Sequence, residues 1–152
     1  MTAQALGQMP SAVLFSCNFN AVRSPMAEAI MKYLYGHIVY VDSVGVRKQP
    51  ADPFAIAVMD EIGLDISKHR PKTFDDLEDT SFDLVITLTP EAQHRALELT
   101  RSMAIEVEYW PMPDPTAAVG SREQVLEAYR QLRDRLMAKI TQRFGPLAPA
   151  KG

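Results

Sequence analysis

The sequence predicts an α/β fold in which a four-stranded parallel sheet is flanked by helices on both faces. Three observations lead to this prediction. Short apolar runs rich in β-branched residues alternate with longer segments of helical periodicity, which is typical of βαβ units. The length of 152 residues fits one domain, because two separate cores would each be small and marginal. The composition, 47% hydrophobic and 23% charged, is that of a globular protein.

Each predicted strand is a short run between turn signals. The run at 84–88 is continuously apolar, so we expect that strand to be buried on both faces. The run at 105–109 alternates with period two, which places it nearer an edge. The predicted strands are 12–15, 38–41, 84–88 and 105–109.

Four helices are expected between and after these strands. Pro25 suits a first helical position, and Met26, Ile30 and Tyr33 fall on one face of the first helix. Asp52 stands where an N-cap belongs, so we interpret it as structural. The predicted helices are 25–35, 53–62, 90–100 and 121–144, the last ended by Gly145-Pro146. We therefore expect one domain over 1–152, with an ordered core over about 11–144 and a frayed tail at 145–152.

Charge and cysteine content exclude several classes of protein. Sixteen Lys and Arg against nineteen Asp and Glu give a net charge of 16 − 19 = −3. A weakly acidic chain has no overall positive field to attract a nucleic acid backbone. No apolar stretch reaches the length of a membrane span, and no secretory signal is visible. Cys17 is the chain's one cysteine, so an internal disulfide is impossible and a cytoplasmic, reducing location is expected.

The candidate chemistry follows the first predicted strand, at the sheet edge where α/β proteins bind ligands. Cys17 is followed after five residues by Arg23 and Ser24, and a helix opens there. Five intervening residues can curl so that their N–H groups bind a tetrahedral oxyanion, and Arg23 can clamp two of its oxygens. The same groups stabilise a Cys17 thiolate, which is then a nucleophile for phosphoryl transfer. The predicted phosphate-binding residues are Asn18, Phe19, Asn20, Ala21, Val22, Arg23 and Ser24.

A structural interpretation competes with this one, in which Cys17 is a small buried residue and Arg23 a surface cation. The Arg-Ser pair at these offsets, between a strand and a helix, favours the functional interpretation. Within the loop, Asn20 tolerates a left-handed φ, and Ser24 can donate its hydroxyl to the sulfur.

These residues make the chain similar to the low-molecular-weight protein tyrosine phosphatases, a family that also contains thioredoxin-linked arsenate reductases. The resemblance covers nearly the whole chain. It implies a four-stranded parallel sheet, a Cys17 nucleophile, an Arg23 clamp, and a supporting network of Asn20, Ser24, Ser43 and His69. The matching positions are Cys17, Asn20, Arg23, Ser24, Pro25, Ala27, Glu28, Ser43, Gly45, His69 and Asp114-Pro115.

The resemblance also implies that Asp114 is a general acid and then a general base. The segment from Trp110 to Pro115 follows the last strand, and three prolines stiffen it. Without the Cys17 motif, Asp114 would be only one more loop carboxylate. With that motif, it is the predicted proton donor to the leaving group.

Four departures from the phosphatase pattern weaken a phosphotyrosine assignment. Phe19 stands where a glycine is usual, Ala21 where a larger residue is common, Val22 where many members carry cysteine, and Thr116 where tyrosine is frequent. The loop from Val46 to Pro53 adds no evident aromatic wall. Phe19, Ala21 and Met26-Ala27 resemble the arsenate reductase branch instead, as does the segment 50–68.

The sequence predicts a phosphatase that acts on phosphate monoesters through a phosphocysteine intermediate. Phosphotyrosine on proteins is the favoured substrate, and phosphoarginine and a small phosphate ester fit the same loop. One alternative is an arsenate reductase that uses an external thiol, since the disulfide-forming mechanism needs further cysteines. The other is a module that binds an oxyanion or phosphoprotein without turnover. Partners are a phosphorylated protein or small phosphate ester, with inorganic phosphate or another oxyanion as ligand. No metal is expected, because no group of His, Cys, Asp and Glu has metal-ligand spacing, and the predicted mechanism requires no cofactor.

Overall fold

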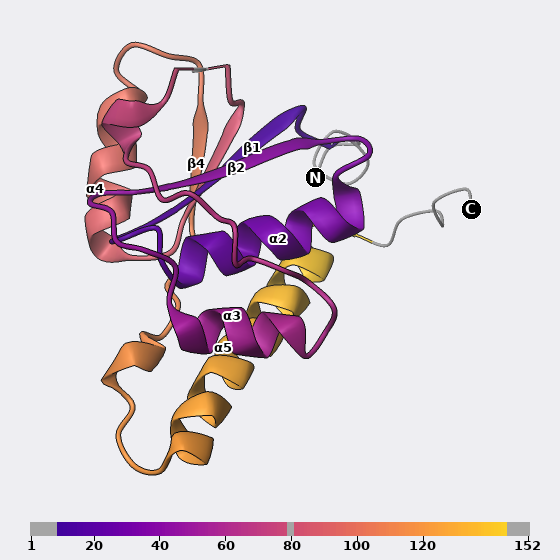
Figure 1. Cartoon of the computed structure of the whole chain (residues 1–152). Coiled ribbons are helices and arrows are strands. Elements are labelled where there is room, and N and C mark those ends of the chain that lie inside the picture. Colours follow the sequence, from indigo (N-terminus) through magenta and orange to yellow (C-terminus); the bar gives the residue numbers. More distant parts are fainter. Residues whose placement is uncertain (1–8, 79–80, 146–152) are drawn as a thin grey trace.

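The computed structural model describes residues 9–78 and 81–145 (Figure 1). Its four strands form one parallel sheet, as the sequence predicts, and their order is β2-β1-β3-β4. β1 and β3 are central and fully buried, which confirms the predicted burial of β3, and β4 is an edge strand, as predicted. The strands are β1 (Ala12–Cys17), β2 (Tyr40–Gly45), β3 (Leu84–Thr87) and β4 (Glu106–Tyr109).

Helices cover both faces of the sheet. α2, α3 and α5 lie together on one face, and α4 packs on the other (Figure 1). One 3-10 turn lies between α3 and β3, and the other follows β4. The bounds are α2 (Arg23–Tyr35), α3 (Pro53–Asp60), α4 (Pro90–Leu99), α5 (Arg122–Phe144), η1 (Phe74–Asp76) and η2 (Pro115–Ala117).

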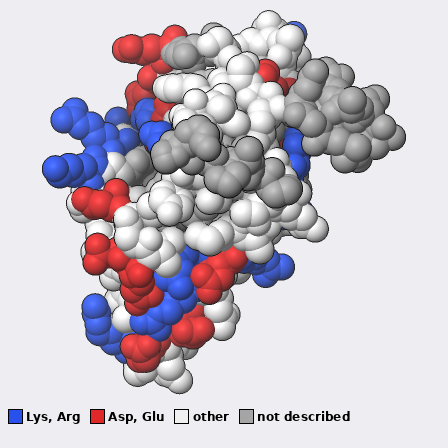
Figure 2. All heavy atoms as spheres, turned by 90° about the vertical axis from the view of Figure 1, so that its right-hand side faces the viewer, with Lys and Arg blue, Asp and Glu red and all other residues white. Residues whose placement is uncertain are grey.

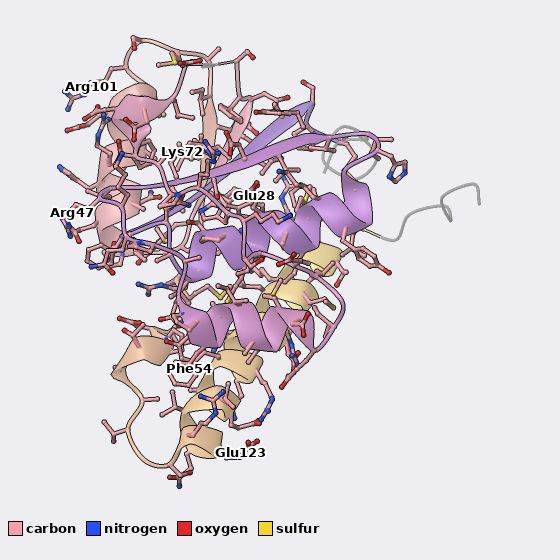
Figure 3. All side chains as sticks on the ribbon, viewed as in Figure 1. Glu28, Arg47, Phe54, Lys72, Arg101 and Glu123 are labelled. Carbon is pink, nitrogen blue, oxygen red and sulfur yellow. The ribbon has the colours of Figure 1, made fainter. Side chains whose placement is uncertain are left out.

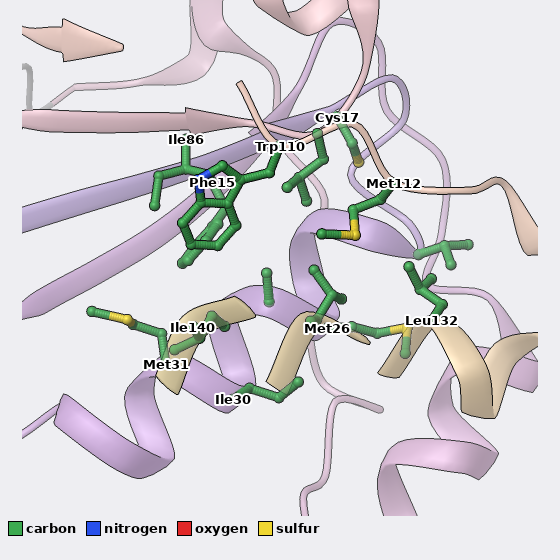
Figure 4. Close-up of a cluster of buried hydrophobic side chains, with 14 of the residues drawn as sticks. Phe15, Cys17, Met26, Ile30, Met31, Ile86, Trp110, Met112, Leu132 and Ile140 are labelled. Carbon is green, nitrogen blue, oxygen red and sulfur yellow. The ribbon is translucent and has the colours of Figure 1, made fainter. Parts of the chain in front are cut away.

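β1 divides the core into two layers because successive side chains of a strand point to opposite faces. Val13, Phe15 and Cys17 join the larger cluster with α2, α3 and α5, whereas Leu14 packs on the α4 side. Figure 4 shows Cys17 at the upper edge of the larger cluster, near Met112. Cys17, the last residue of β1, therefore lies where the core meets the carboxyl edge of the sheet.

Helix starts follow the capping rules. The Asp52 carboxylate accepts hydrogen bonds from the N–H groups of Phe54 and Ala55, which confirms it as the N-cap of α3. Ser121 caps α5 in a reciprocal arrangement with Gln124. Pro25 is the third residue of α2 rather than the first, and its missing N–H costs nothing there, because first-turn N–H groups have no helical partner.

Two details of the sequence prediction are wrong. The second strand begins at Tyr40 and continues to Gly45, because the N–H groups of Ile38 and Val39 still bond the Tyr35 carbonyl at the end of α2. Tyr33 is 71% exposed. The buried face of α2 contains Ala27 and Met31 beside Met26 and Ile30, since this helix packs against both the sheet and α5.

Surface charge on the face in Figure 2 is mixed, with acidic and basic side chains together at the lower end, where α3 and the start of α5 lie. Glu61 pairs there with Arg130 and Arg133, at 2.9 and 2.8 Å. No helix among residues 9–78 and 81–145 is long and apolar enough to cross a membrane. The predicted frayed tail lies, beyond Gly145, outside the described residues.

Candidate active site

The backbone carbonyl groups of the loop between β1 and α2 accept hydrogen bonds from neighbouring segments, which hold the loop in place. Five consecutive carbonyls, from Cys17 to Ala21, have partners outside the loop. His69 lies 3.2 Å from the Asn20 carbonyl oxygen, and the segment that follows β2 supplies the rest. Those donors are the N–H groups of Val46, Arg47, Gln49 and Asp52, bonded to Cys17, Asn18, Phe19 and Ala21 at 3.0, 2.7, 3.0 and 3.1 Å.

With its carbonyls turned outward, the loop leaves its N–H groups unused. Among residues 9–78 and 81–145, no group accepts a hydrogen bond from the backbone N–H groups of residues 18–22. Asn20 has a φ of 55°, the left-handed conformation expected from the sequence, and it makes the sharp turn of the loop. The loop and the start of α2 together form a concave array of donors suited to an anion.

Cys17 lies at the base of this array and is 2% exposed. Its Sγ is 2.9 Å from the Ser24 hydroxyl oxygen, and the Ser24 N–H donates to it at 3.4 Å. Ser24 is fully buried in the first turn of α2. Cys17 therefore lies against the first turn of α2, with the Ser24 N–H directed at its sulfur.

Arg23 connects the loop to the segment that follows β4. Its Nη1 donates to the carbonyl oxygen of Met112 at 3.2 Å, while the side chain also lines the pocket above Cys17. This contact ties the orientation of the guanidinium to the segment that carries Asp114.

The pocket has a volume of about 640 Å³ and brings together Cys17, Arg23 and Asp114. Asp114 is exposed and caps η2: its Oδ1 accepts from the N–H and hydroxyl of Thr116, at 3.0 and 2.6 Å. The chain thus folds so that all three residues predicted to be catalytic line one pocket, although they are separated by up to 97 positions (114 − 17).

A buried polar network lies beneath the loop and contains each of the four supporting residues predicted. The Asn20 amide donates to the hydroxyls of Ser24 and Ser43, at 2.9 and 3.0 Å. Nε2 of His69 lies 2.9 Å from Asn20 Oδ1. Nε2 also lies near the Asn20 carbonyl oxygen, and because both oxygens can only accept, Nε2 carries the ring proton. Burial lowers the pKa of His69 and outweighs the attraction of Glu28 for the charged form.

Glu28 is a member of this network that the sequence did not assign. The Ser43 hydroxyl donates to its Oε1 at 2.5 Å, and Lys32 pairs with its Oε2 at 2.6 Å. Its carboxylate, labelled in Figure 3, comes from the second turn of α2 and is mostly buried. The sequence signal was its place five residues after Arg23 within the motif, which gave no hint of its partners.

The walls of the pocket also include residues without a predicted role. Gln49 to Pro53 form one side, so Asp52 caps α3 and faces the pocket at once. Its second oxygen accepts from the Tyr129 hydroxyl at 2.9 Å. As expected, this segment adds no aromatic side chain. The aromatic wall comes instead from Phe19, whose ring is covered by the Arg47 guanidinium at 5.3 Å from its centre.

Comparison with known proteins identifies the fold and its relatives. A curated arsenate reductase of Halalkalibacterium halodurans is 34% identical over 128 residues, which cover 84% of this chain and 91% of that protein. The arsenate reductase of Bacillus subtilis is 31% identical over 124 residues, covering 82% and 88%.

Solved structures agree with these sequence matches. An arsenate reductase in the phosphate-binding state superposes with a TM-score of 0.68 at 28% identity, covering 87% of this chain and 95% of the other. A low molecular weight protein tyrosine phosphatase from T. tengcongensis gives 0.70 at 28% identity, covering 86% and 95%. The model of the low molecular weight phosphotyrosine protein phosphatase family matches residues 12–148, and the chain belongs to that family.

Proposed function

We propose that the chain is a cysteine-dependent phosphatase that hydrolyses phosphate monoesters, with phosphotyrosine on proteins as its substrate. The observation that supports this most is the pocket in which Cys17, Arg23 and Asp114 meet above a loop with unused N–H groups. This arrangement combines a nucleophile, a transition-state clamp and a proton donor.

In the first step the Cys17 thiolate attacks phosphorus, and the bond from phosphorus to the leaving oxygen breaks. Asp114, as the carboxylic acid, gives its proton to that oxygen. The equatorial oxygens gain charge, and Arg23 and the N–H groups of residues 18–23 stabilise it. The products of this step are the alcohol or phenol and a phosphocysteine.

In the second step water attacks the phosphocysteine. The Asp114 carboxylate takes a proton from the water, and the phosphorus–sulfur bond breaks. The Ser24 hydroxyl, 2.9 Å from the sulfur, stabilises the departing thiolate. Inorganic phosphate leaves and the free enzyme returns, so no cofactor is consumed.

The names of the curated relatives favour a second candidate, arsenate reduction. Cys17 is the only cysteine in the sequence, so electrons must come from external thiols. In that reaction arsenate condenses with Cys17, and one thiol attacks the sulfur, leaving arsenite and a mixed disulfide. A second thiol then frees Cys17 and forms the external disulfide. A reducing compartment, such as the cytoplasm, suits both candidates.

The test compares wild type, Cys17→Ser, Asp114→Asn and the control Asp60→Asn on aryl phosphates and a phosphotyrosine peptide. We expect no turnover by Cys17→Ser and unchanged turnover by Asp60→Asn. Asp114→Asn should lower kcat by about 10²- to 10⁴-fold, most for poor leaving groups. Full activity of Cys17→Ser would overturn both enzymatic candidates.

The remaining arms separate the candidates. Thiol consumption that depends on arsenate and survives Asp114→Asn, without ester hydrolysis, would favour the reductase. Binding of phosphate or vanadate without turnover of ester or arsenate would favour a non-catalytic oxyanion-binding module.

A further inference from the structure

A second concavity lies between helix α5 and the end of β4 with the segment that follows it. It has a volume of about 390 Å³. We name it the α5 groove. Tyr109, Trp110 and Pro111 form one side, and Arg135, Lys139 and Gln142 of α5 form the other. None of these residues belongs to the proposed catalytic machinery.

The α5 groove offers uncommitted positive charge. Arg135 and Lys139 are four residues apart, so both side chains lie on one face of the helix. Both are exposed, and neither has an ion pair among residues 9–78 and 81–145. The Lys139 ammonium instead lies over the Trp110 ring, 5.7 Å from its centre. The nearby acid Glu108 is already paired with Arg143, at 2.7 Å.

The same groove offers apolar surface for a peptide to cover. Tyr109 is 41% exposed at the end of β4, and Pro111 is exposed beside it. Aromatic and arginine side chains are the types enriched where proteins bind other proteins. The segments 1–8 and 146–152 contain no Asp or Glu, so neither terminus of this chain matches the charge of the groove.

One segment joins the α5 groove to the catalytic pocket. Met112 lines the groove, and its carbonyl oxygen accepts from Arg23 at the pocket. From Trp110 to Asp114 the chain advances four residues, which span at most about 14 Å when extended. A bound peptide in extended conformation needs about four residues to cover the same distance.

We propose that the α5 groove docks an acidic flank of the phosphoprotein substrate, about three to five residues from the phosphorylated residue. The inference rests on the proposed function for what enters the pocket. Carboxylates of the flank pair with Arg135 and Lys139, and an apolar neighbour packs on Tyr109 and Pro111. The pairing raises the affinity for one class of protein substrate without changing the chemical step.

The kinetic test uses two phosphotyrosine peptides that differ only in Glu-Glu or Gln-Gln four residues from the phosphotyrosine. We expect kcat/KM to be about three- to tenfold higher for the acidic peptide, as two exposed ion pairs allow, and the gain to fall with salt. Arg135→Gln/Lys139→Gln should abolish that preference through KM and leave aryl phosphate hydrolysis unchanged. The matched control is Lys68→Gln/Arg101→Gln, which removes two exposed cations outside the groove.

A binding test does not depend on turnover. Trp110 is the chain's single tryptophan, so its fluorescence reports on the groove directly. The unphosphorylated Glu-Glu peptide, titrated into wild type, should change that fluorescence with saturation. The double groove variant should lose the response, and the Lys68/Arg101 control should keep it.

Where turnover is measurable, the kinetic comparison of the two peptides decides the docking proposal. Where it is not, the fluorescence titration decides it. Equal kcat/KM for the two peptides, or a preference that survives the groove variant, overturns the docking proposal while the phosphatase stands. If no ester is hydrolysed but the groove-dependent fluorescence change occurs, the phosphatase fails and docking stands. No turnover and no such fluorescence change would overturn both.

Discussion

Gly45 lies so close to the catalytic loop that a β-carbon on it would come within 2.6 Å of the backbone nitrogen of Asn20. The same carbon would lie 2.4 Å from the Arg47 carbonyl oxygen. Both neighbours are backbone atoms, which cannot rotate away. The end of β2 therefore packs directly on the loop, and this contact requires the glycine.

Replacing that glycine should damage the loop itself. We expect Gly45→Ala to lower the free energy of unfolding by about 1–3 kcal/mol, because the loop must shift. Affinity for inorganic phosphate should fall at least about tenfold, since displaced N–H groups no longer converge. Urea unfolding and calorimetric titration with phosphate measure the two effects.

Gly63→Ala is the matched control. Gly63, unlike Gly45, has a positive φ, 81°, and a β-carbon on it would meet nothing within 4 Å. It should cost about 1–2 kcal/mol of stability through strain alone and leave phosphate affinity unchanged. Equal phosphate affinities for Gly45→Ala and wild type would contradict the role given to the close contact.

Asn20 serves the loop in two ways that a pair of variants separates. Asn20→Gly keeps the positive φ but removes the amide bonded to Ser24, Ser43 and His69. We expect a loss of about 2–4 kcal/mol in the free energy of unfolding, because buried partners lose their hydrogen bonds. Asn20→Ala should lose about 1–2 kcal/mol more, since alanine also strains the backbone. Equal unfolding midpoints for both variants would show that φ contributes nothing.

Much of the fold could be predicted because its signals are local. Apolar runs that alternate with helical segments predict the parallel sheet. Asp52 as an N-cap and Asn20 as a turn residue are also predictable, because both roles depend on residue type and on close neighbours in the sequence. The second strand was misplaced because β propensity favours Ile38, whereas Asp42 and Ser43 become a strand only by pairing with β1.

The candidate site could be predicted less completely, for a similar reason. Cys17, Arg23 and Ser24 share one motif, so spacing alone brings them together. The contact between Glu28 and Ser43 and the pocket-facing position of Asp52 arise only when α2, β2 and α3 assemble. The α5 groove likewise joins residues about 25 positions apart, for instance Trp110 and Arg135, and no local pattern marks it.

Tyr129 supports the pocket wall through Asp52. Burial, as the larger cause, and the hydrogen bond to Asp52, as the second, raise the pKa of Tyr129. The hydroxyl therefore keeps its proton and donates a hydrogen bond to Asp52. Tyr129→Phe keeps the ring packed on Phe54, at 5.5 Å between centres, and removes only the donor. We expect the free energy of unfolding to fall by about 1.5–3 kcal/mol, as for hydrogen bonds to charged groups. Phe54→Leu, which perturbs the packing and keeps the donor, is the comparison. An unchanged unfolding midpoint in Tyr129→Phe would show that water replaces the hydroxyl at no cost.

Glu61 makes the free energy of unfolding depend on pH in the acidic range. Hydrogen bonds from Arg130 and then from Arg133 lower the pKa of Glu61 from 4.5 to about 2. Its folded pKa thus lies below its unfolded pKa, and at intermediate pH the unfolded chain binds a proton that the folded chain does not. The contribution is complete above about pH 4.5 and is lost as pH falls toward 2.

Glu61→Gln should therefore flatten the fall of unfolding free energy across that range and lower stability at neutral pH. The control is Glu127→Gln, whose carboxylate is exposed and contacts Arg130 at 3.4 Å, and which should leave the slope nearly unchanged. High salt should shrink the difference, since the partly exposed pairs are screened. Denaturant titrations at neutral pH and at several points between pH 4.5 and 2 give the slopes. Parallel curves for wild type and Glu61→Gln would show that the two arginines hold this carboxylate no better in the folded chain than water does in the unfolded one.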